Sequence, residues 1–119
     1  MSNDRDPAAR DARPFITFGR YAGPATFILS SLAAGPKHGY ALTKDIEAFA
    51  GLRLAPGTLY EALTRLESRG FIEALPAEER RRPYRLTPSG AKALRLQLDA
   101  QAQVAKLGLA RLAQSEGRA

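Results

Sequence analysis

Residues 54–73, LAPGTLYEALTRLESRGFIE, carry more hydrogen-bonding side chains than a short amphipathic helix needs. Tyr60, Thr64, Arg65 and Arg69 supply a phenol, a hydroxyl and two guanidinium groups. These groups donate hydrogen bonds to phosphate oxygens and planar acceptors, and one guanidinium can donate two parallel bonds. No histidine, the commonest catalytic base, lies within the stretch. The stretch is therefore suited to recognition of a polar or anionic partner.

The rest of the chain offers little for catalysis. It contains one histidine, His38, and no cysteine, so it has no thiolate zinc site and no disulfide framework. The GxSxG, GxxxxGK and GxGxxG patterns of hydrolases and nucleotide-binding enzymes are missing from the sequence. We expect no enzyme activity, no metal and no cofactor.

The recognition stretch itself predicts a helix. Pro56 stands at the preferred first helical position, and Gly70 is a typical stop. Leu59, Leu63 and Leu66 recur at helical spacing and form one apolar stripe. Burial of that stripe leaves the other side of the helix exposed, which carries Tyr60, Glu61, Thr64, Arg65, Ser68 and Arg69.

Two further helices precede it. One opens at Gly23-Pro24 and ends before Gly35-Pro36, and a second begins after a short turn with Tyr40 in its first turn and ends near residue 51. In the second helix Leu42, Ile46 and Phe49 are spaced as one buried stripe. Residues 52–54 could add a short extended piece.

A hairpin and a long helix follow. Residues 71–75 and 84–87 read as two strands, joined by the charged tip AEERRRP. Thr87-Pro88 then combines a hydroxyl cap with a proline at the first helical position, and the helix is predicted to run to about Ala113.

The last helix has two apolar faces. At about 100° per residue, one sector holds Leu94, Leu98, Ala105, Leu109 and Leu112, and another holds Leu96, Ala100, Val104 and Leu107. One small domain can cover only one such face. We therefore expect the helix to pack against a second copy of the chain, in a two-fold dimer.

Composition sets the broad class. The chain has 119 residues, a formal net charge of +6 and a pI of about 10.2, which favours an acidic partner such as nucleic acid. No apolar run is long enough to span a membrane, and no signal peptide is recognisable. Together with the lack of cysteine, this predicts a cytoplasmic protein without a membrane partner.

The order of elements, three helices, a hairpin and a helix, is that of a winged helix-turn-helix, mainly α with a small β-hairpin. In that fold the third helix enters the DNA major groove and the hairpin lies along the backbone. The expected organisation is a disordered N-terminal arm at 1–13, a winged helix-turn-helix DNA-binding domain with an N-terminal docking segment at 14–88, and a C-terminal dimerisation helix with a short tail at 88–119.

Four blocks carry a family resemblance: GPKHGYAL, PGTLYEAL, LESRGFIE and YRLTPSG, in this order. They resemble the PadR-like transcriptional regulators over about residues 28–98. The resemblance implies a homodimer that represses transcription from a two-fold symmetric operator in double-stranded DNA. With one helix after the hairpin, the chain is similar to the small branch of the family, in which an aromatic or drug-like inducer could bind near the dimer interface.

Two positions depart from the family pattern. A serine commonly stands before Pro-Gly-Thr and caps the recognition helix, whereas Ala55 has no side-chain acceptor. The hairpin usually reads Arg-Pro-Arg-Arg before two tyrosines, but here residues 79–83 precede the single Tyr84. The length and reach of the hairpin are therefore left open by the sequence.

The predicted DNA contacts come from three places, and each has a purely structural alternative. Arg65 is the expected base reader but could instead pair with Glu61. His38 could bind phosphate or only cap its helix, and Tyr60 could bind phosphate or cover the core. The full predicted set is Lys37, His38, Tyr40, Thr58, Tyr60, Thr64, Arg65, Arg69, Arg80, Arg81 and Arg82.

The N-terminal segment leaves two hypotheses open. Phe15 and Phe18 are too apolar for a free tail and could dock on the domain or on the partner's long helix, which places them with the dimer interface. Alternatively, they and Tyr21 could line an aromatic pocket in a small-molecule sensor without DNA binding. A protein-binding adaptor that keeps the winged-helix scaffold is a further alternative.

Overall fold

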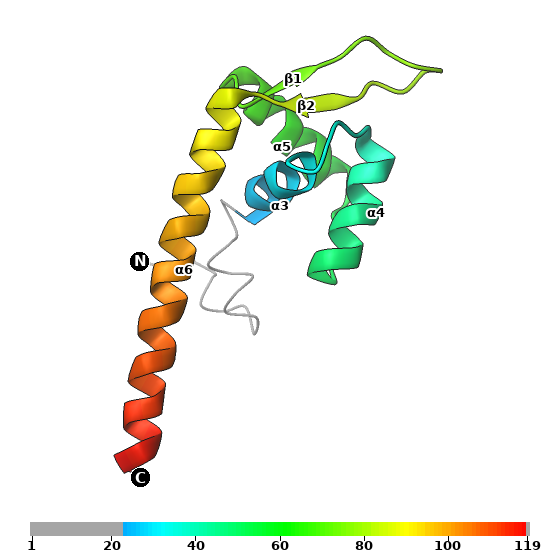
Figure 1. Ribbon diagram of the computed structural model, residues 1–119. Helices are drawn as coiled ribbons and strands as arrows, with labels where there is room; N and C mark the ends of the chain where they lie inside the picture. Colours follow the sequence, from blue (N-terminus) through cyan, green and yellow to red (C-terminus); the bar gives the residue numbers. More distant parts are fainter. Residues whose placement is uncertain (1–22, 119) are drawn as a thin grey trace, which may run out of the picture.

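A computed structural model describes residues 23–118 of the chain, and the sequence-based predictions for residues 1–13, Phe15, Phe18 and Tyr21 lie outside that range. The described part is mainly helical with one antiparallel hairpin, as expected (Figure 1). The elements are α3 (Gly23–Leu32), α4 (Gly39–Ala50), α5 (Pro56–Ser68), β1 (Ile72–Ala74), β2 (Tyr84–Leu86) and α6 (Pro88–Arg118).

Three helices surround the core. The predicted stripe of α5 is buried as expected, and Leu63 meets Ile28 of α3 and Ile46 of α4 in one cluster. Each fully buried leucine or isoleucine contributes about 1.5–3 kcal/mol through removal of apolar surface from water. Burial of this stripe therefore determines which side of α5 faces outward.

One member of the α4 stripe was wrongly predicted to be buried. Phe49 is 51% exposed, and its ring meets Phe27 edge-on with 6.3 Å between the ring centroids. It lies in the last turn of α4. The apolar spacing of the helix continues to this turn, but the turn lies beyond the buried core.

The signals at the helix ends act as predicted. Pro56 begins α5, and Ala55 at its N-cap makes no side-chain hydrogen bond. Gly51 and Gly70 follow α4 and α5 with φ of 72° and 78°, a left-handed conformation that glycine adopts without steric cost.

The hairpin is joined by a third segment that local patterns did not reveal. Ile72 pairs with Leu86, and Ala74 pairs with Tyr84. On the far side of Tyr84, Lys37 exchanges two backbone hydrogen bonds with it, of 3.1 and 2.9 Å. Residues 52–54 form no strand, so this link between α3, α4 and the hairpin replaces the predicted extended piece.

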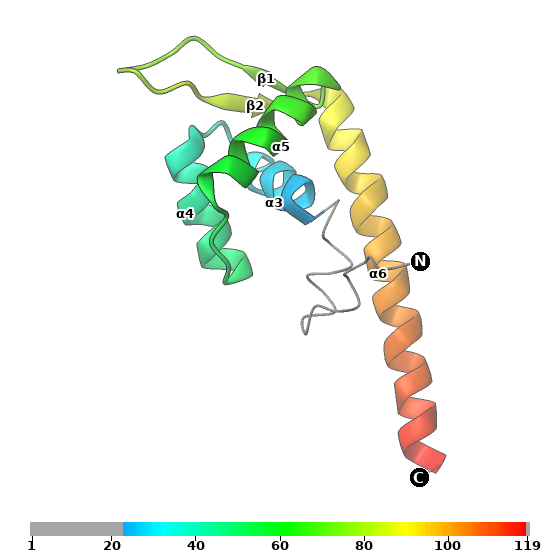
Figure 2. The same cartoon turned by 180° about the vertical axis from the view of Figure 1, so that it is seen from behind.

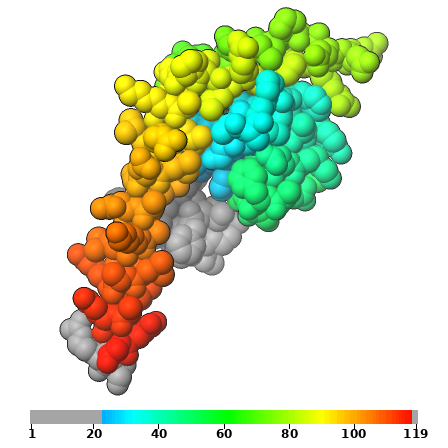
Figure 3. Space-filling view, in the orientation of Figure 1, coloured from blue at the N-terminus to red at the C-terminus, as the bar shows by residue number. Residues whose placement is uncertain are grey.

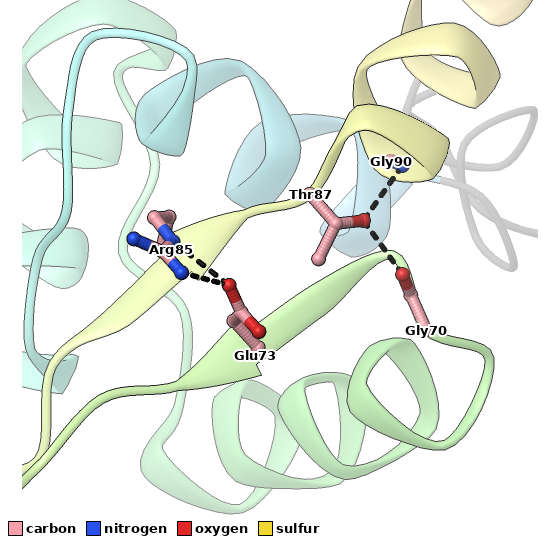
Figure 4. A network of polar contacts seen from close by, with 5 residues as sticks. All are labelled: Gly70, Glu73, Arg85, Thr87 and Gly90. Carbon is pink, nitrogen blue, oxygen red and sulfur yellow. Dashed lines mark hydrogen bonds and ion pairs between the residues drawn. The ribbon is translucent and has the colours of Figure 1, made fainter.

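Thr87 connects the hairpin to α6 in the way its sequence predicts. Its Oγ1 accepts a 3.0 Å hydrogen bond from the Gly90 amide and donates a 2.6 Å bond to the Gly70 carbonyl (Figure 4). The hydroxyl thus caps α6 and ties it to the end of α5. Beside it, Arg85 and Glu73 form a cross-strand ion pair.

The long helix projects from the rest of the described chain (Figures 1 and 3). It ends at Arg118, later than the predicted Ala113, because the residues after Ala113 include no proline. Leu94 is packed into the chain's own core, whereas every residue from 98 to 117 is exposed. No helix among the described residues is long and apolar enough to cross a membrane.

Candidate nucleic-acid interface

The outer side of α5 is open to solvent. Seen from behind, α5 crosses α3 with that side uncovered (Figure 2). Tyr60 is 53% exposed, and Thr58, Thr64, Arg65 and Arg69 are exposed as well. The polar groups that the sequence singled out therefore share one accessible helix surface.

Two of these groups already have partners within α5. The Arg65 guanidinium lies 3.2 Å from the Glu61 carboxylate, four residues earlier. The Thr64 hydroxyl donates a 2.9 Å hydrogen bond to the Tyr60 carbonyl. An exposed ion pair of this kind contributes only about 0.3–0.5 kcal/mol, so Arg65 can be withdrawn from it at little cost.

Tyr60 also touches the start of α4. Its phenol lies over Gly39, where an added Cβ would be 2.5 Å from the hydroxyl oxygen. The Tyr60 ring therefore packs on α4 while about half of the residue stays exposed, and its predicted contact with phosphate stays a prediction. Tyr40, in the first turn of α4, is 61% exposed.

His38 acts as the cap of α4. Its Nδ1 accepts a 3.4 Å hydrogen bond from the Ala41 amide, and its Nε2 lies 3.2 Å from Nη1 of Arg81. The side chain thus links the start of α4 to the hairpin tip.

Lys37 is engaged inside its own chain. Its ammonium donates a 2.6 Å hydrogen bond to the Ser31 carbonyl and lies 4.0 Å from the Asp45 carboxylate. A lysine at the end of a helix favours the exposed carbonyls of the last turn. Its predicted contact with phosphate stays untested, but its ammonium is largely occupied at the end of α3.

The hairpin tip is a tight turn. Glu78 and Arg81 exchange two backbone hydrogen bonds, and between them Glu79 and Arg80 have φ of 48° and 71°. Two positive φ angles are typical of a type I′ turn, which usually contains asparagine and glycine. Arg82 donates a hydrogen bond to the Leu75 carbonyl of the opposite segment. Arg80 therefore stands at the tip of the turn.

Tyr84 lies in β2, close to Tyr60 and Glu67 of α5. Burial raises the pKa of its phenol above 10.0, and the nearby Glu67 carboxylate and Tyr60 phenol raise it further, whereas Arg82 lowers it. The phenol is accordingly neutral at physiological pH.

A cavity of about 440 Å³ lies along one edge of the exposed side of α5, between that helix, α3 and α6. Leu29, Leu66 and Phe71 contribute apolar surface to it, and Arg65 and Arg69 contribute charge. Three of the predicted DNA contacts, Thr58, Arg65 and Arg69, thus also line a space large enough for a small molecule.

Residues 28–96 match the Transcriptional regulator PadR-like family, which is more than half of the chain. The chain belongs to this family. Its structure is accordingly a PadR-like winged helix with a long C-terminal helix.

Individual proteins are similar to this PadR-like chain. The transcriptional regulator Rv3488 of Mycobacterium tuberculosis is 42% identical over 73 residues, 56% of this chain and 64% of that protein. An uncharacterized 37.1 kDa protein in transposon TN4556 of Streptomyces fradiae is 48% identical over 67 residues, 56% of this chain and 19% of that protein. The chain therefore spans less than two thirds of either relative.

A solved structure has the same fold. It is a transcriptional regulator from Clostridium thermocellum with 35% sequence identity and a TM-score of 0.64, and the match covers 69% of the PadR-like chain and 85% of that structure.

Some residues that position the site were not anticipated. Ser31 is 1% exposed, and its hydroxyl donates a 2.6 Å hydrogen bond to Asp45, which joins α3 to α4. Gly39 and Gly90 are needed for close approach, with Phe71 beside Gly90. The PadR-like blocks include both glycines, but their role depends on neighbours that are distant in sequence.

Proposed function

We propose that the chain is a homodimeric, sequence-specific DNA-binding regulator that acts in the cytoplasm as a repressor. The observation that carries this proposal is the exposed polar side of α5, flanked by the start of α4 and the basic hairpin tip. An exposed helix beside a hairpin is the docking geometry of winged helices, in which base edges are read in the major groove and phosphates are held at its sides.

The long helix supports the dimer. Leu96, Val104, Leu109 and Leu112 are 58–70% exposed in the single chain. A projecting helix that exposes this much apolar surface gains stability from a partner with the same surface, as a two-fold dimer provides. Leu94 already serves its own core, so the proposed interface consists of the residues farther along α6, Leu98, Ala105, Leu109 and Leu112 among them.

The cavity supports relief of repression by a small molecule. Its volume of about 440 Å³ falls within the range of about 300–1,000 Å³ that is usual for ligand pockets. Because Arg65 and Arg69 line it, an aromatic or drug-like inducer there would compete with DNA for the same side chains.

Selection of bound fragments from random DNA tests the proposed function. We expect a two-fold symmetric site whose half-sites lie about one helical turn apart. Arg65→Ala should weaken binding and relax the preference at one base pair, whereas the same change at a phosphate contact should weaken binding to all sequences alike. Recovery of asymmetric, unrelated fragments would refute sequence-specific binding by a symmetric dimer.

Salt dependence distinguishes the regulator from a protein-binding adaptor. Binding through several phosphates should weaken steeply as salt increases, because counterions are released from the DNA. Binding to a protein through a mainly apolar contact should not weaken in this way as salt increases. Sedimentation equilibrium tests the dimer independently, and Leu109→Asp should dissociate it, whereas Lys106→Asp, on the polar side of the same helix, should not.

A further inference from the structure

His38 and Arg81 face each other in a way that requires a third group. His38 Nδ1 is the acceptor of the Ala41 amide, and His38 Nε2 lies 3.2 Å from Arg81 Nη1. A neutral imidazole carries one N–H, and a guanidinium nitrogen is always a donor. Both contacts can therefore be hydrogen bonds only if both ring nitrogens are acceptors, which no protonation state allows.

Each state of the ring leaves one donor facing another. With the proton on Nε2, the cap of α4 is kept and the Nε2–H faces Arg81. With the proton on Nδ1, Arg81 has its acceptor but the Ala41 amide loses its own. The doubly protonated ring has an N–H at both nitrogens, so neither the Ala41 amide nor Arg81 finds an acceptor.

The surroundings favour the proton on Nε2. The contact between His38 and Ala41 is partly buried, whereas the contact between His38 and Arg81 is exposed. A backbone amide deprived of its acceptor costs more where water has less access. The stable arrangement therefore presents two donors, from α4 and from the hairpin tip, toward one point on the surface.

We infer that His38 and Arg81 together form one binding site for a single phosphodiester group of the DNA backbone. One phosphate oxygen between the two donors accepts from both, which resolves the mismatch and fixes the hairpin tip against α4. This inference rests on the proposed function and deepens it, because two residues expected to bind DNA separately become one site.

Inorganic phosphate tests the site without DNA. His38 is the only histidine of the chain, so its ring signals in ¹⁵N–¹H NMR spectra are unambiguous. At pH 8 we expect its signals to shift to saturation on titration with phosphate. The shift should vanish in Arg81→Ala and persist in Lys44→Ala, which removes an exposed cation elsewhere on α4. Failure of the wild-type signals to respond would overturn the site.

A double-mutant cycle tests it on DNA. His38→Asn keeps an N-cap acceptor for α4 but removes the distal N–H, and we expect about tenfold weaker binding. Added to Arg81→Ala, it should cost less than about twofold more, because the shared phosphate is already lost. Added to Lys44→Ala, it should cost its full tenfold.

The outcomes separate the two claims. Additive effects of His38→Asn and Arg81→Ala, in a protein that binds DNA, would overturn the shared site and leave the proposed function intact. A wild-type protein that binds no DNA would refute the proposed function, and the phosphate titration would still decide the site.

Discussion

The phenol of Tyr60 occupies the space that a side chain at residue 39 would need. A Cβ on Gly39 would lie 2.5 Å from the hydroxyl oxygen and 3.1 Å from the ring carbon that carries it. The start of α4 and the outer side of α5 are thereby held at close distance. This contact sets the position of the start of α4, where His38 is proposed to bind phosphate, relative to α5, the helix proposed to read bases.

Gly39→Ala should lower the free energy of unfolding in urea by about 1 kcal/mol, because the phenol must move away. In a Tyr60→Phe background the loss should be smaller, since the closest atom is gone. Equal losses in the two backgrounds would show that the contact is not responsible.

Gly90 should tolerate no side chain at all. A Cβ there would lie 2.0 Å from the Phe71 carbonyl oxygen, and backbone cannot swing aside as a side chain can. We expect Gly90→Ala to destabilise the fold by about 3 kcal/mol. Gly108, in the same helix, has no atom within 4 Å of its added Cβ, so Gly108→Ala should stabilise by about 1 kcal/mol. Both are measured in urea at one fixed protein concentration.

The start of α5 can be improved. Ala55 makes no side-chain cap, so Ala55→Ser should raise the free energy of unfolding by about 1 kcal/mol. Ala55→Val changes the side chain without supplying an acceptor and should give no gain. A similar gain from both variants would argue against capping as the cause.

The hairpin tip stores backbone strain at Arg80, whose φ is 71°. A left-handed conformation costs a residue other than glycine about 1–2 kcal/mol. Arg80→Gly should therefore be more stable than Arg80→Ala by about 1 kcal/mol, although both remove the same charge. Thermal unfolding of the two variants measures the difference, and identical midpoints would show that the turn relaxes.

Tyr84 should make the protein sensitive to alkali. Burial raises the pKa of its phenol in the folded chain above the unfolded value of 10.0. Between these two pKa values the unfolded chain has lost a proton that the folded chain retains, so stability falls as pH rises from about 10. Tyr84→Phe removes this ionisation, and its stability should decline less over that range in pH-dependent urea unfolding.

Much of the fold could be predicted because its signals are local. Pro56 and Gly70 begin and end α5 within one stretch, and Thr87 caps α6 through an amide three residues away. Phe49 shows the limit of such signals. Its spacing matches that of Ile46, but burial depends on whether another element covers that turn.

In the candidate site, too, local spacing predicts some features and the packing of distant elements decides others. The leucine stripe of α5 was sufficient to predict which polar residues face outward, because helical period links the two sides. Lys37 was assigned to phosphate by its position before α4, yet its ammonium bonds to the Ser31 carbonyl. This intramolecular bond depends on how α3 and α4 pack against each other, which the spacing of residues along the sequence does not reveal, and the phosphate contact stays a prediction.

The sequence by itself determined the elements, their ends and the exposed side of α5, because turn residues and apolar spacing act within a few residues. Only the tertiary structure decided that Tyr60 lies on Gly39, that His38 faces Arg81, and that Lys37 pairs with the hairpin. The partners in these contacts are 21 to 47 residues apart, so the angles at which the elements pack decide them.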